Sequence, residues 1–170
     1  MLDRKVVALL NEQVNKELYS AYLYLDFSNY YYSVNLDGFG NWYRIQAQEE
    51  RDHAMLFIRY LLNNGEEIAL GAVGKPEVAE RSIKALLEQG LAHERYVTEL
   101  IHTIYDAAYS KKDFRTMQFL DWFVKEQGEE ENNADGLIKK YDMFGSDAKG
   151  LYMLNSELTA RAYAAPSLVL

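Results

Sequence analysis

The sequence predicts an all-α protein of one domain, a bundle of four long helices with a shorter fifth. The chain has 170 residues, 49% of them hydrophobic. At this length, one core can bury about 70% of the surface that the unfolded chain exposes. Only two prolines and ten glycines occur, while helix-favouring Leu, Glu, Ala, Lys and Gln recur throughout. No segment alternates apolar and polar residues for long enough to indicate a strand.

Turn residues and helical periodicity divide the chain into five helical segments. The expected helices are about residues 4–33, 38–63, 78–109, 113–144 and 151–163. The first ends near VNLDG and the second stops at NNGEE, since both stretches contain the turn formers Asn and Gly. The third follows a Gly- and Pro-containing stretch. The fourth begins after SKK, where Asp113 is a candidate N-cap, and GSDAKG separates it from the short fifth.

The connection between the second and third helices, GEEIALGAVGKPE, spans about residues 65–77. Glu50 lies about 14 residues before the end of the second helix, and Glu94 about 16 residues after the start of the third. At 1.5 Å per residue, each is about 20–25 Å from that helix end. A tight turn joins the two ends if the helices are antiparallel. About 13 extended residues at about 3.3 Å each cross the full ~45 Å if they are parallel. Residue counting leaves both topologies open.

Each long helix has one apolar stripe, formed at alternating steps of three and four residues, and polar residues interrupt each stripe near its middle. These residues are Glu17 in the first helix, Glu50 and His53 in the second, Glu94 in the third, and Gln127 and Glu130 in the fourth. Glu17 and Glu50 are 33 residues apart, and so are Glu94 and Gln127. Equal separations place the groups at comparable depth. The chain is therefore interpreted as two similar helical hairpins.

The four mid-stripe glutamates predict a metal site. A carboxylate in an apolar interior is costly unless it is paired, protonated or bound to metal, and the stripes carry no positive side chain at that height. Two divalent cations would balance four carboxylate charges. Oxygen ligands with one imidazole suit iron or manganese better than zinc. Glu from two helices and Glu-x-x-His from two others is the known arrangement of di-iron carboxylate proteins, and most of it is present here.

Composition argues against several other kinds of site and partner. The chain has no cysteine, so disulfides, thiolate catalysis and cysteine-based metal sites are excluded. Its net charge is −8, and its largest basic cluster is the pair Lys111–Lys112, so nucleic acid is not an expected partner. No segment approaches the ~18 to 20 apolar residues of a membrane span, and the N-terminal apolar run is too short for a signal peptide. We therefore expect no membrane partner and a cytoplasmic location.

Five segments resemble the bacterial non-haem ferritins, and the likeness covers essentially the whole chain. They are NEQVNKELYSAYLYL at 11–25, QAQEERDHA at 46–54, HE at 93–94, WFVKEQGEEE at 122–131 and GLYMLNSEL at 150–158. The resemblance implies a ferritin-like four-helix bundle with a long crossover between helices two and three and a short C-terminal fifth helix. It also implies iron storage in a hollow homo-oligomeric shell of 24 subunits, with Fe(II) oxidised by dioxygen or hydrogen peroxide.

The same resemblance implies a ferroxidase centre inside each subunit. Its first iron site would use Glu17, Glu50 and His53, with Glu50 bridging to the second iron. Its second iron site would use Glu94 and Glu130. The ligands are flexible carboxylates and a single imidazole, a set that is consistent with releasing oxidised iron rather than retaining it as a fixed cofactor.

Further roles follow from the resemblance for residues beside the centre. Gln127 would be a hydrogen-bonding or weak ligand near the second iron. Glu49, Glu126 and Glu129 would form a third iron site that shares one ligand with the second. Tyr24 would lie beside the centre, where it hydrogen-bonds a ligand or donates an electron. Alternatively, Tyr24 is a structural core residue whose hydroxyl hydrogen-bonds a buried polar group.

Departures from related families sharpen the prediction. Bacterioferritins repeat Glu-x-x-His in the fourth helix, but this chain has Gln127 at the first of those positions, which disfavours a symmetric centre. Their haem methionine is replaced by Asp52, so no haem is expected. His93 and His102 are interpreted as structural or solvated residues. Glu131 is interpreted as solvated, because it lies about 100° around the helix from Glu130.

Two other classes of function are compatible with the residues. One is a di-iron oxidase or oxygenase acting on a small organic substrate, which would need an apolar pocket beside the iron. The other is a structural helical assembly whose acidic residues face water. The apolar C-terminal sequence AAPSLVL fits burial in contacts between subunits, as expected for an assembled shell.

Overall fold

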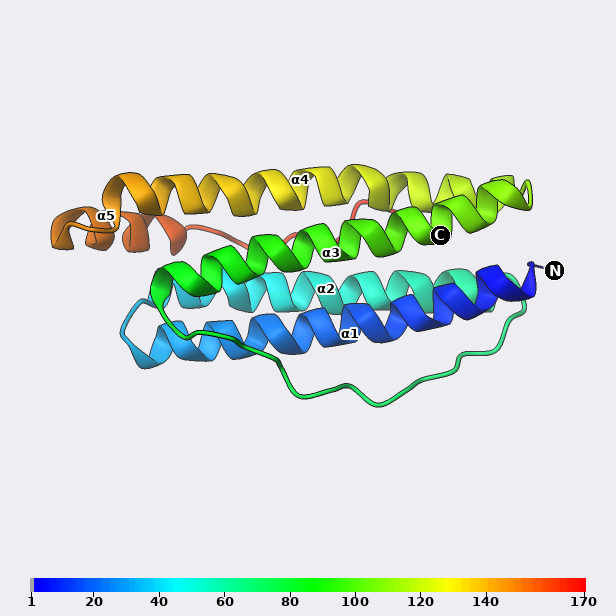
Figure 1. The fold of residues 1–170 in the computed structure, drawn as a ribbon, viewed down its shortest axis with the longest axis horizontal. Helices are drawn as coiled ribbons and strands as arrows, with labels where there is room; N and C mark the ends of the chain where they lie inside the picture. The colour runs from blue at the N-terminus through cyan, green and yellow to red at the C-terminus, as the bar shows by residue number, and fades with distance from the viewer. Residues whose placement is uncertain (1) are drawn as a thin grey trace.

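The computed structural model of the protein describes residues 2–170, and this part of the chain forms five helices and no strand. The helices are α1 (Arg4–Ser33), α2 (Asp37–Asn63), α3 (Ile83–Ser110), α4 (Phe114–Phe144) and α5 (Ala148–Leu158). Figure 1 shows the four long helices lying side by side as a bundle, with α5 folded at one end. The predicted all-α, four-helix architecture with a short fifth helix is confirmed.

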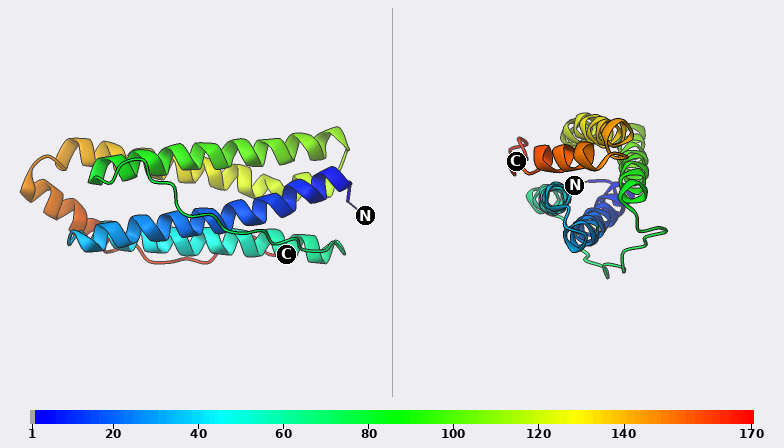
Figure 2. Two further views of the ribbon diagram at one scale, coloured as in Figure 1. Left: turned by 60° about the horizontal axis from the view of Figure 1, so that its bottom comes forward. Right: turned by 90° about the vertical axis from the view of Figure 1, so that its left-hand side faces the viewer.

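The path of the chain settles the topology that residue counting left open. Helices α1 and α2 form one antiparallel hairpin and α3 and α4 form another, while the connection after α2 runs the whole length of the bundle (Figures 1 and 2). Helices α2 and α3 therefore run in the same direction, and the long crossover is correct. Two asparagines of α1 hold the irregular connection between α2 and α3 by hydrogen bonds to its backbone. Asn11 bonds to Glu67 and Ala69, and Asn15 bonds to Gly71 and Ala72.

Side-chain caps fix the starts of α1, α3, α4 and α5, whereas α2 begins without one. Asp3, Ser82, Asp113 and Asp147 each accept a hydrogen bond from a backbone N–H in the first turn that follows. The predicted cap at Asp113 is confirmed, with its Oδ1 3.1 Å from the N–H of Thr116.

Three predicted boundaries, in two of the helices, are wrong. The third helix was expected from about residue 78 but begins at Ile83, because Ser82 caps it and Gln89 holds the preceding segment extended through Ala79 N and Glu80 O. The fifth helix was expected over about 151–163 but spans Ala148–Leu158. It starts earlier because Asp147 caps it. It ends earlier because the amide of Asn41 binds the carbonyls of Leu158 and Arg161 and directs the chain back along α2.

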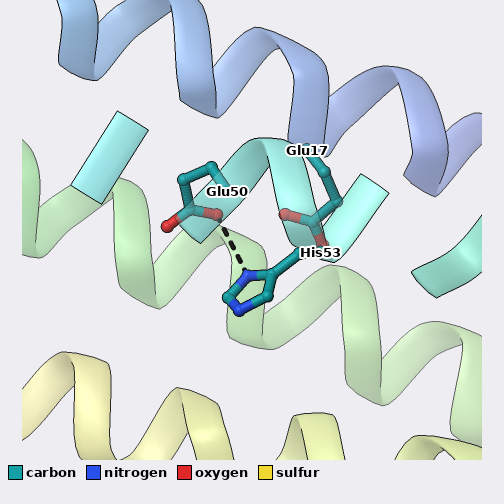
Figure 3. A group of neighbouring side chains, drawn as sticks. All are labelled: Glu17, Glu50 and His53. Carbon is teal, nitrogen blue, oxygen red and sulfur yellow. Dashed lines mark ion pairs between the residues drawn. The ribbon is translucent and has the colours of Figure 1, made fainter. Parts of the chain in front are cut away.

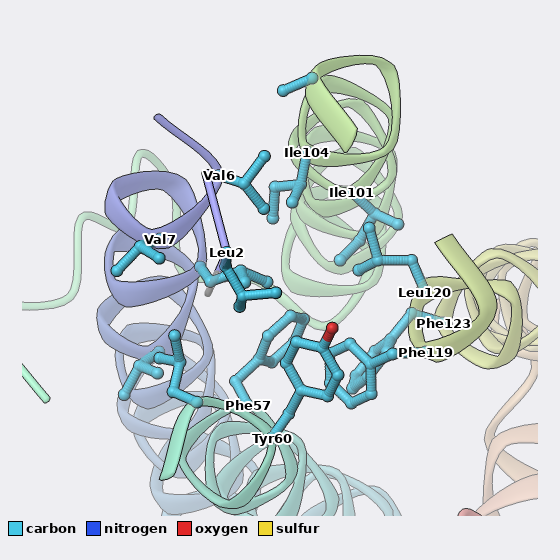
Figure 4. Packing of buried hydrophobic residues seen from close by; sticks show 14 of the residues in the cluster. Leu2, Val6, Val7, Phe57, Tyr60, Ile101, Ile104, Phe119, Leu120 and Phe123 are labelled. Carbon is cyan, nitrogen blue, oxygen red and sulfur yellow. The ribbon is translucent and has the colours of Figure 1, made fainter. Parts of the chain in front are cut away.

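The core is divided into two apolar clusters, one toward each end of the bundle. The first, near the start of α1, includes Val6, Leu10, Phe57, Tyr60, Ile101, Phe119 and Phe123 (Figure 4). The second, toward α5, includes Phe27, Tyr31, Phe39, Tyr43, Leu86 and Leu154. The polar mid-stripe residues lie between these clusters, so the middle of the bundle is the part that apolar packing does not fill. Within residues 2–170, no helix has both the length and the apolarity that crossing a membrane requires.

Gly38 allows α5 to lie directly against the start of α2. A Cβ on Gly38 would be 1.7 Å from the backbone oxygen of Asn155, whose side chain also accepts a hydrogen bond of 2.8 Å from the Gly38 N–H. We expect Gly38→Ala to force α5 away and to lower the free energy of unfolding by about 3 kcal/mol or more. Calorimetric melting of the purified protein measures this effect.

Gly136→Ala is the matched control, because a Cβ there meets nothing within 4 Å. That substitution should stabilise α4 by up to about 1 kcal/mol through helix propensity alone. A Gly38→Ala protein that melts together with the wild type would contradict the close packing of α5.

Candidate metal centre

All six polar residues that interrupt the predicted stripes point into the bundle. None has more than 8% of its surface exposed: Glu17, Glu50, His53, Glu94, Gln127 and Glu130. They come from four helices, one or two from each, and Glu50 and His53 share a face because they are three residues apart. The structure therefore brings together, at one depth, the groups that sequence periodicity singled out.

The half of the site on α1 and α2 has the geometry of a cation site. One ligand atom each from Glu17, Glu50 and His53 lies within 4.8 Å of the others, and within residues 2–170 this is the one group of three or more potential metal ligands so arranged. Figure 3 shows the three side chains converging, with His53 Nδ1 3.4 Å from Glu50 Oε2. Glu17 Oε2 is buried and has no hydrogen-bond partner. An unpaired buried carboxylate oxygen is costly, and a bound cation would satisfy it.

The half of the site on α3 and α4 is held by hydrogen bonds. The hydroxyl of Tyr24 donates to Glu94 Oε1, and Gln127 Nε2 lies 3.2 Å from Glu94 Oε2. Gln46 Nε2 donates to Glu130 Oε2 at 2.8 Å. Each of these donors is buried, so the two carboxylates are fixed in place by protein groups alone.

Two glutamines that the sequence analysis missed complete the inner arrangement. Gln13 Nε2 donates to Glu17 Oε1 at 2.8 Å, and Gln46 Nε2 donates to Glu50 Oε1 at 3.1 Å as well as to Glu130. Each glutamine lies four residues before the glutamate it supports, on the same helical face. This i, i+4 spacing was a signal available in the sequence. Gln46 also links the two halves of the site, because its amide contacts a carboxylate of each.

Burial and mutual repulsion favour the protonated form of most carboxyl groups in the centre. Burial, and then the charge of Glu50, raises the pKa of Glu17 to about 8 and that of Glu130 to about 7. The pKa of Glu94 is raised well above its ordinary value by the same two causes. Burial is the largest influence on both Glu50 and His53 and disfavours the charged form of each, but their mutual hydrogen bond and the attraction of neighbouring opposite charges together outweigh it. The pKa of Glu50 is therefore lowered and that of His53 is raised to about 10. Metal ions would replace these protons.

The residues expected to form a third iron site are less closely gathered. Glu49 and Glu126 are half-buried, and burial raises the pKa of each carboxyl. Glu129 is exposed and lies 3.5 Å from Lys125. Glu49 already has a cationic partner, because Arg161 Nη2 lies 2.5 Å from its Oε2. The helical stripes carry no Lys or Arg at this height, but the C-terminal segment brings an arginine to this edge of the site.

The remaining histidines and Glu131 divide between structure and solvent. His93 Nε2 is 2.7 Å from Ser20 Oγ, and burial lowers the pKa of its ring, as expected for a structural residue. His102 is exposed. Glu131 accepts a hydrogen bond of 2.6 Å from the hydroxyl of Thr98, so its interpretation as simply solvated is wrong. Glu99 and His102 have the same Glu-x-x-His spacing as Glu50 and His53, yet both face outward, so the spacing alone does not make a site.

Comparison with known proteins places this geometry in one family. A family model described as a Ferritin-like domain matches residues 7–144. A bacterial non-heme ferritin of Campylobacter jejuni is 40% identical over 153 residues, which cover 90% of this chain and 92% of that protein. One from Staphylococcus epidermidis is 36% identical over 163 residues, 96% of this chain and 98% of that protein. Among solved structures, an Archaeoglobus fulgidus ferritin engineered to a closed form aligns with a TM-score of 0.93 and 41% identity, over 96% of this chain and 100% of that one.

Proposed function

The chain belongs to the ferritin family, and from this premise we propose that it stores iron by oxidising Fe(II) at the buried centre between its four long helices. The observation that carries the proposal is the cluster of four buried carboxylates, which has too few positive partners within the protein to balance its charge. Glu17 Oε2 accepts no hydrogen bond at all. Two Fe(II) ions carry four positive charges, which balance the four glutamates of the centre. Iron here is the substrate of the protein.

The first Fe(II) would be bound by Glu17, Glu50 and His53, whose ligand atoms already converge. The second would be bound by Glu94 and Glu130, with Glu50 bridging the two ions and Gln127 supporting Glu94 by its hydrogen bond. Removing one electron from each ion supplies two electrons. Dioxygen accepts them with two protons to give hydrogen peroxide, or hydrogen peroxide accepts them with two protons to give two water molecules. The oxidised iron then leaves for a mineral core, with Glu49, Glu126 and Glu129 as a third iron site nearby.

The small free volume beside the centre favours this reaction over oxidation of an organic substrate. The cavity that touches Glu94 and Glu130 has a volume of about 20 Å³, room for about one water molecule. A small oxidant or water fits there, whereas an organic substrate needs several hundred Å³. Among the described residues, the cavity that touches Glu94 and Glu130 is therefore too small to be the apolar pocket that a di-iron oxygenase requires.

Tyr24 is proposed to position Glu94 for the second iron. Its buried hydroxyl donates to Glu94 Oε1, so Tyr24→Phe removes a hydrogen bond to a ligand without opening the core. We expect the initial rate of Fe(II) oxidation to fall about tenfold, the effect of losing one hydrogen bond to a charged group, while two Fe(II) still bind. Stopped-flow absorbance under air measures the rate.

Tyr60→Phe is the matched control, because that buried hydroxyl pairs with Thr116 at 2.8 Å in the first apolar cluster. It should leave the oxidation rate unchanged. Wild-type rates in Tyr24→Phe would remove Tyr24 from the proposed machinery.

Storage needs a container, so we also propose a homo-oligomeric shell of 24 subunits in the cytoplasm. No haem is proposed, since the carboxylate of Asp52 stands where bacterioferritins have their haem methionine and accepts a hydrogen bond from the Tyr163 hydroxyl at 2.5 Å. Aerobic loading with Fe(II), followed by size-exclusion chromatography and metal analysis of the protein peak, tests the function. Thousands of iron atoms in a large particle are expected. About two iron atoms per chain in a small particle would indicate an oxygenase-like enzyme, and none a structural assembly.

A further inference from the structure

The C-terminal segment after α5, residues 159–170, brings one arginine back to the edge of the metal centre. Arg161 Nη2 lies 2.5 Å from Glu49 Oε2 and 3.0 Å from Gln46 Oε1, and its Nη1 donates to the Trp42 carbonyl at 3.1 Å. The guanidinium also lies over the Trp42 ring, 4.2 Å from its centre. With 16% of the Arg161 side chain and 18% of the Glu49 side chain exposed, this ion pair is largely withdrawn from water.

The backbone around Arg161 is anchored on both sides, so the contact is built into the fold. Asn41 Nδ2 donates to the carbonyl of Arg161 at 3.0 Å. Further along, the Tyr163 hydroxyl donates to Asp52 on α2, and Trp122 Nε1 of α4 donates to Ser167 Oγ at 2.9 Å. Figure 1 shows the segment returning from α5 along the bundle. These contacts hold the guanidinium against α2, where it contacts Gln46. Gln46 in turn donates to Glu50, a proposed ligand of the two-iron centre.

The guanidinium uses the same carboxylate that a third iron would need. Glu49 Oε2 cannot bind a cation and keep the charge-assisted hydrogen bond from Arg161 at the same time. Arg161 also donates to Gln46 Oε1, which turns the Gln46 amide nitrogen toward Glu50 and Glu130. The arginine therefore neutralises one ligand of the third site and orients a glutamine that supports both halves of the two-iron centre.

We infer that Arg161 is a tethered cation that keeps the third iron site closed, and that iron binds at Glu49 only when the Arg161 guanidinium is displaced. This inference rests on the proposed function, because it concerns the third site of the same iron centre. Arg161 acts as a positioning residue: it touches Glu49 and Gln46, and affects iron through them. The third binding step is consequently weakened by competition within the chain, while the first two steps are not.

The test is a calorimetric titration of the assembled, metal-free protein with Fe(II) in the absence of oxygen. It yields the number of ions bound per chain and the affinity of each binding step. Arg161→Gln removes the charge and keeps a hydrogen-bonding side chain, and should tighten the third step about tenfold or more, as expected for loss of a largely buried competing charge. Arg161→Lys keeps the charge but not the stacking and forked hydrogen bonds of the guanidinium, and should bind the third ion more weakly than Arg161→Gln does. Arg115→Gln, which changes the net charge equally at an exposed site beside Asn64, should match wild type.

An unchanged or weaker third step in Arg161→Gln would overturn the inference. So would Arg161→Lys behaving like Arg161→Gln, because loss of packing rather than loss of charge would then be responsible. Failure of the proposed function is distinguishable from both results, since wild type and all three variants would then lack the first two binding steps as well.

Discussion

Replacing Glu50 and His53 together by alanine should abolish rapid Fe(II) oxidation and leave the bundle folded. The pair supplies two of the three converging ligands of the first iron site, and Glu50 is the proposed bridge to the second. Loss of supporting residues alone costs about 10- to 100-fold at metal sites, so loss of two direct ligands should lower the initial rate by more than about a hundredfold. The fold should survive because removing both members of the pair leaves neither of them as an unpaired buried charge. Stopped-flow oxidation and circular dichroism measure the two effects.

Glu99→Ala with His102→Ala is the control for this experiment. It removes the same two residue types at the same spacing from the exposed face of α3, and should oxidise Fe(II) at the wild-type rate. Normal initial rates in Glu50→Ala/His53→Ala would mean that oxidation takes place elsewhere on the protein.

Metal-free protein loses stability as the pH rises from about 5 to 8, whereas iron-loaded protein does not. The folded-state pKa of Glu17 is raised from 4.5 to about 8, so its stabilising contribution is complete below pH 4.5 and is lost as the pH rises toward 8. His53, raised from 6.5 to about 10, acts in the same direction at higher pH. The pKa of Glu50 is lowered from 4.5, so its opposite contribution is lost only as the pH falls below that value. Each extra proton bound by the folded state gives a slope of about 1.4 kcal/mol per pH unit.

Glu17→Gln removes one of these protons and should flatten the slope by about 1.4 kcal/mol per pH unit between pH 5.5 and 7. Metal-bound protein should instead gain stability with rising pH, because metal and protons compete for the same ligands. Calorimetric melting at a series of pH values, with and without metal, gives both slopes. Glu12→Gln, an exposed change on the same helix, should keep the wild-type slope. An identical slope in Glu17→Gln would mean that Glu17 is ionised in the metal-free centre.

The parts of the structure that depend on local periodicity could be predicted from the sequence. The six mid-stripe residues were found because a buried helical face repeats every three or four residues, and a polar residue on it is conspicuous. The start of α3 was misplaced because residues 78–82 contain no helix breaker, and the deciding hydrogen bonds from Gln89 come from within the helix that follows. The crossover could not be derived by counting, because both topologies satisfied the same lengths.

Contacts made by the C-terminal segment were beyond reach of the sequence. Arg161 is far along the chain from Glu49 and lies outside any helix, so no periodicity connects them. The four stripes carry no Lys or Arg at the height of the centre, but the sequence did not show that burial beside Glu50 would favour a protonated His53 or that tertiary folding would bring Arg161 from outside the stripes. Gln46 differs, since its position four residues before Glu50 made it detectable.

The most direct test of the centre is a crystal structure of protein soaked with Fe(II) in the absence of oxygen, with anomalous scattering recorded at the iron absorption edge. We predict two iron peaks in each chain, one bound by Glu17, Glu50 and His53 and the other by Glu94 and Glu130, with Glu50 between them. Glu17 Oε2, which accepts no hydrogen bond from the protein, should bind the first iron. Iron peaks found only on the surface, with none inside the bundle, would contradict the proposed centre.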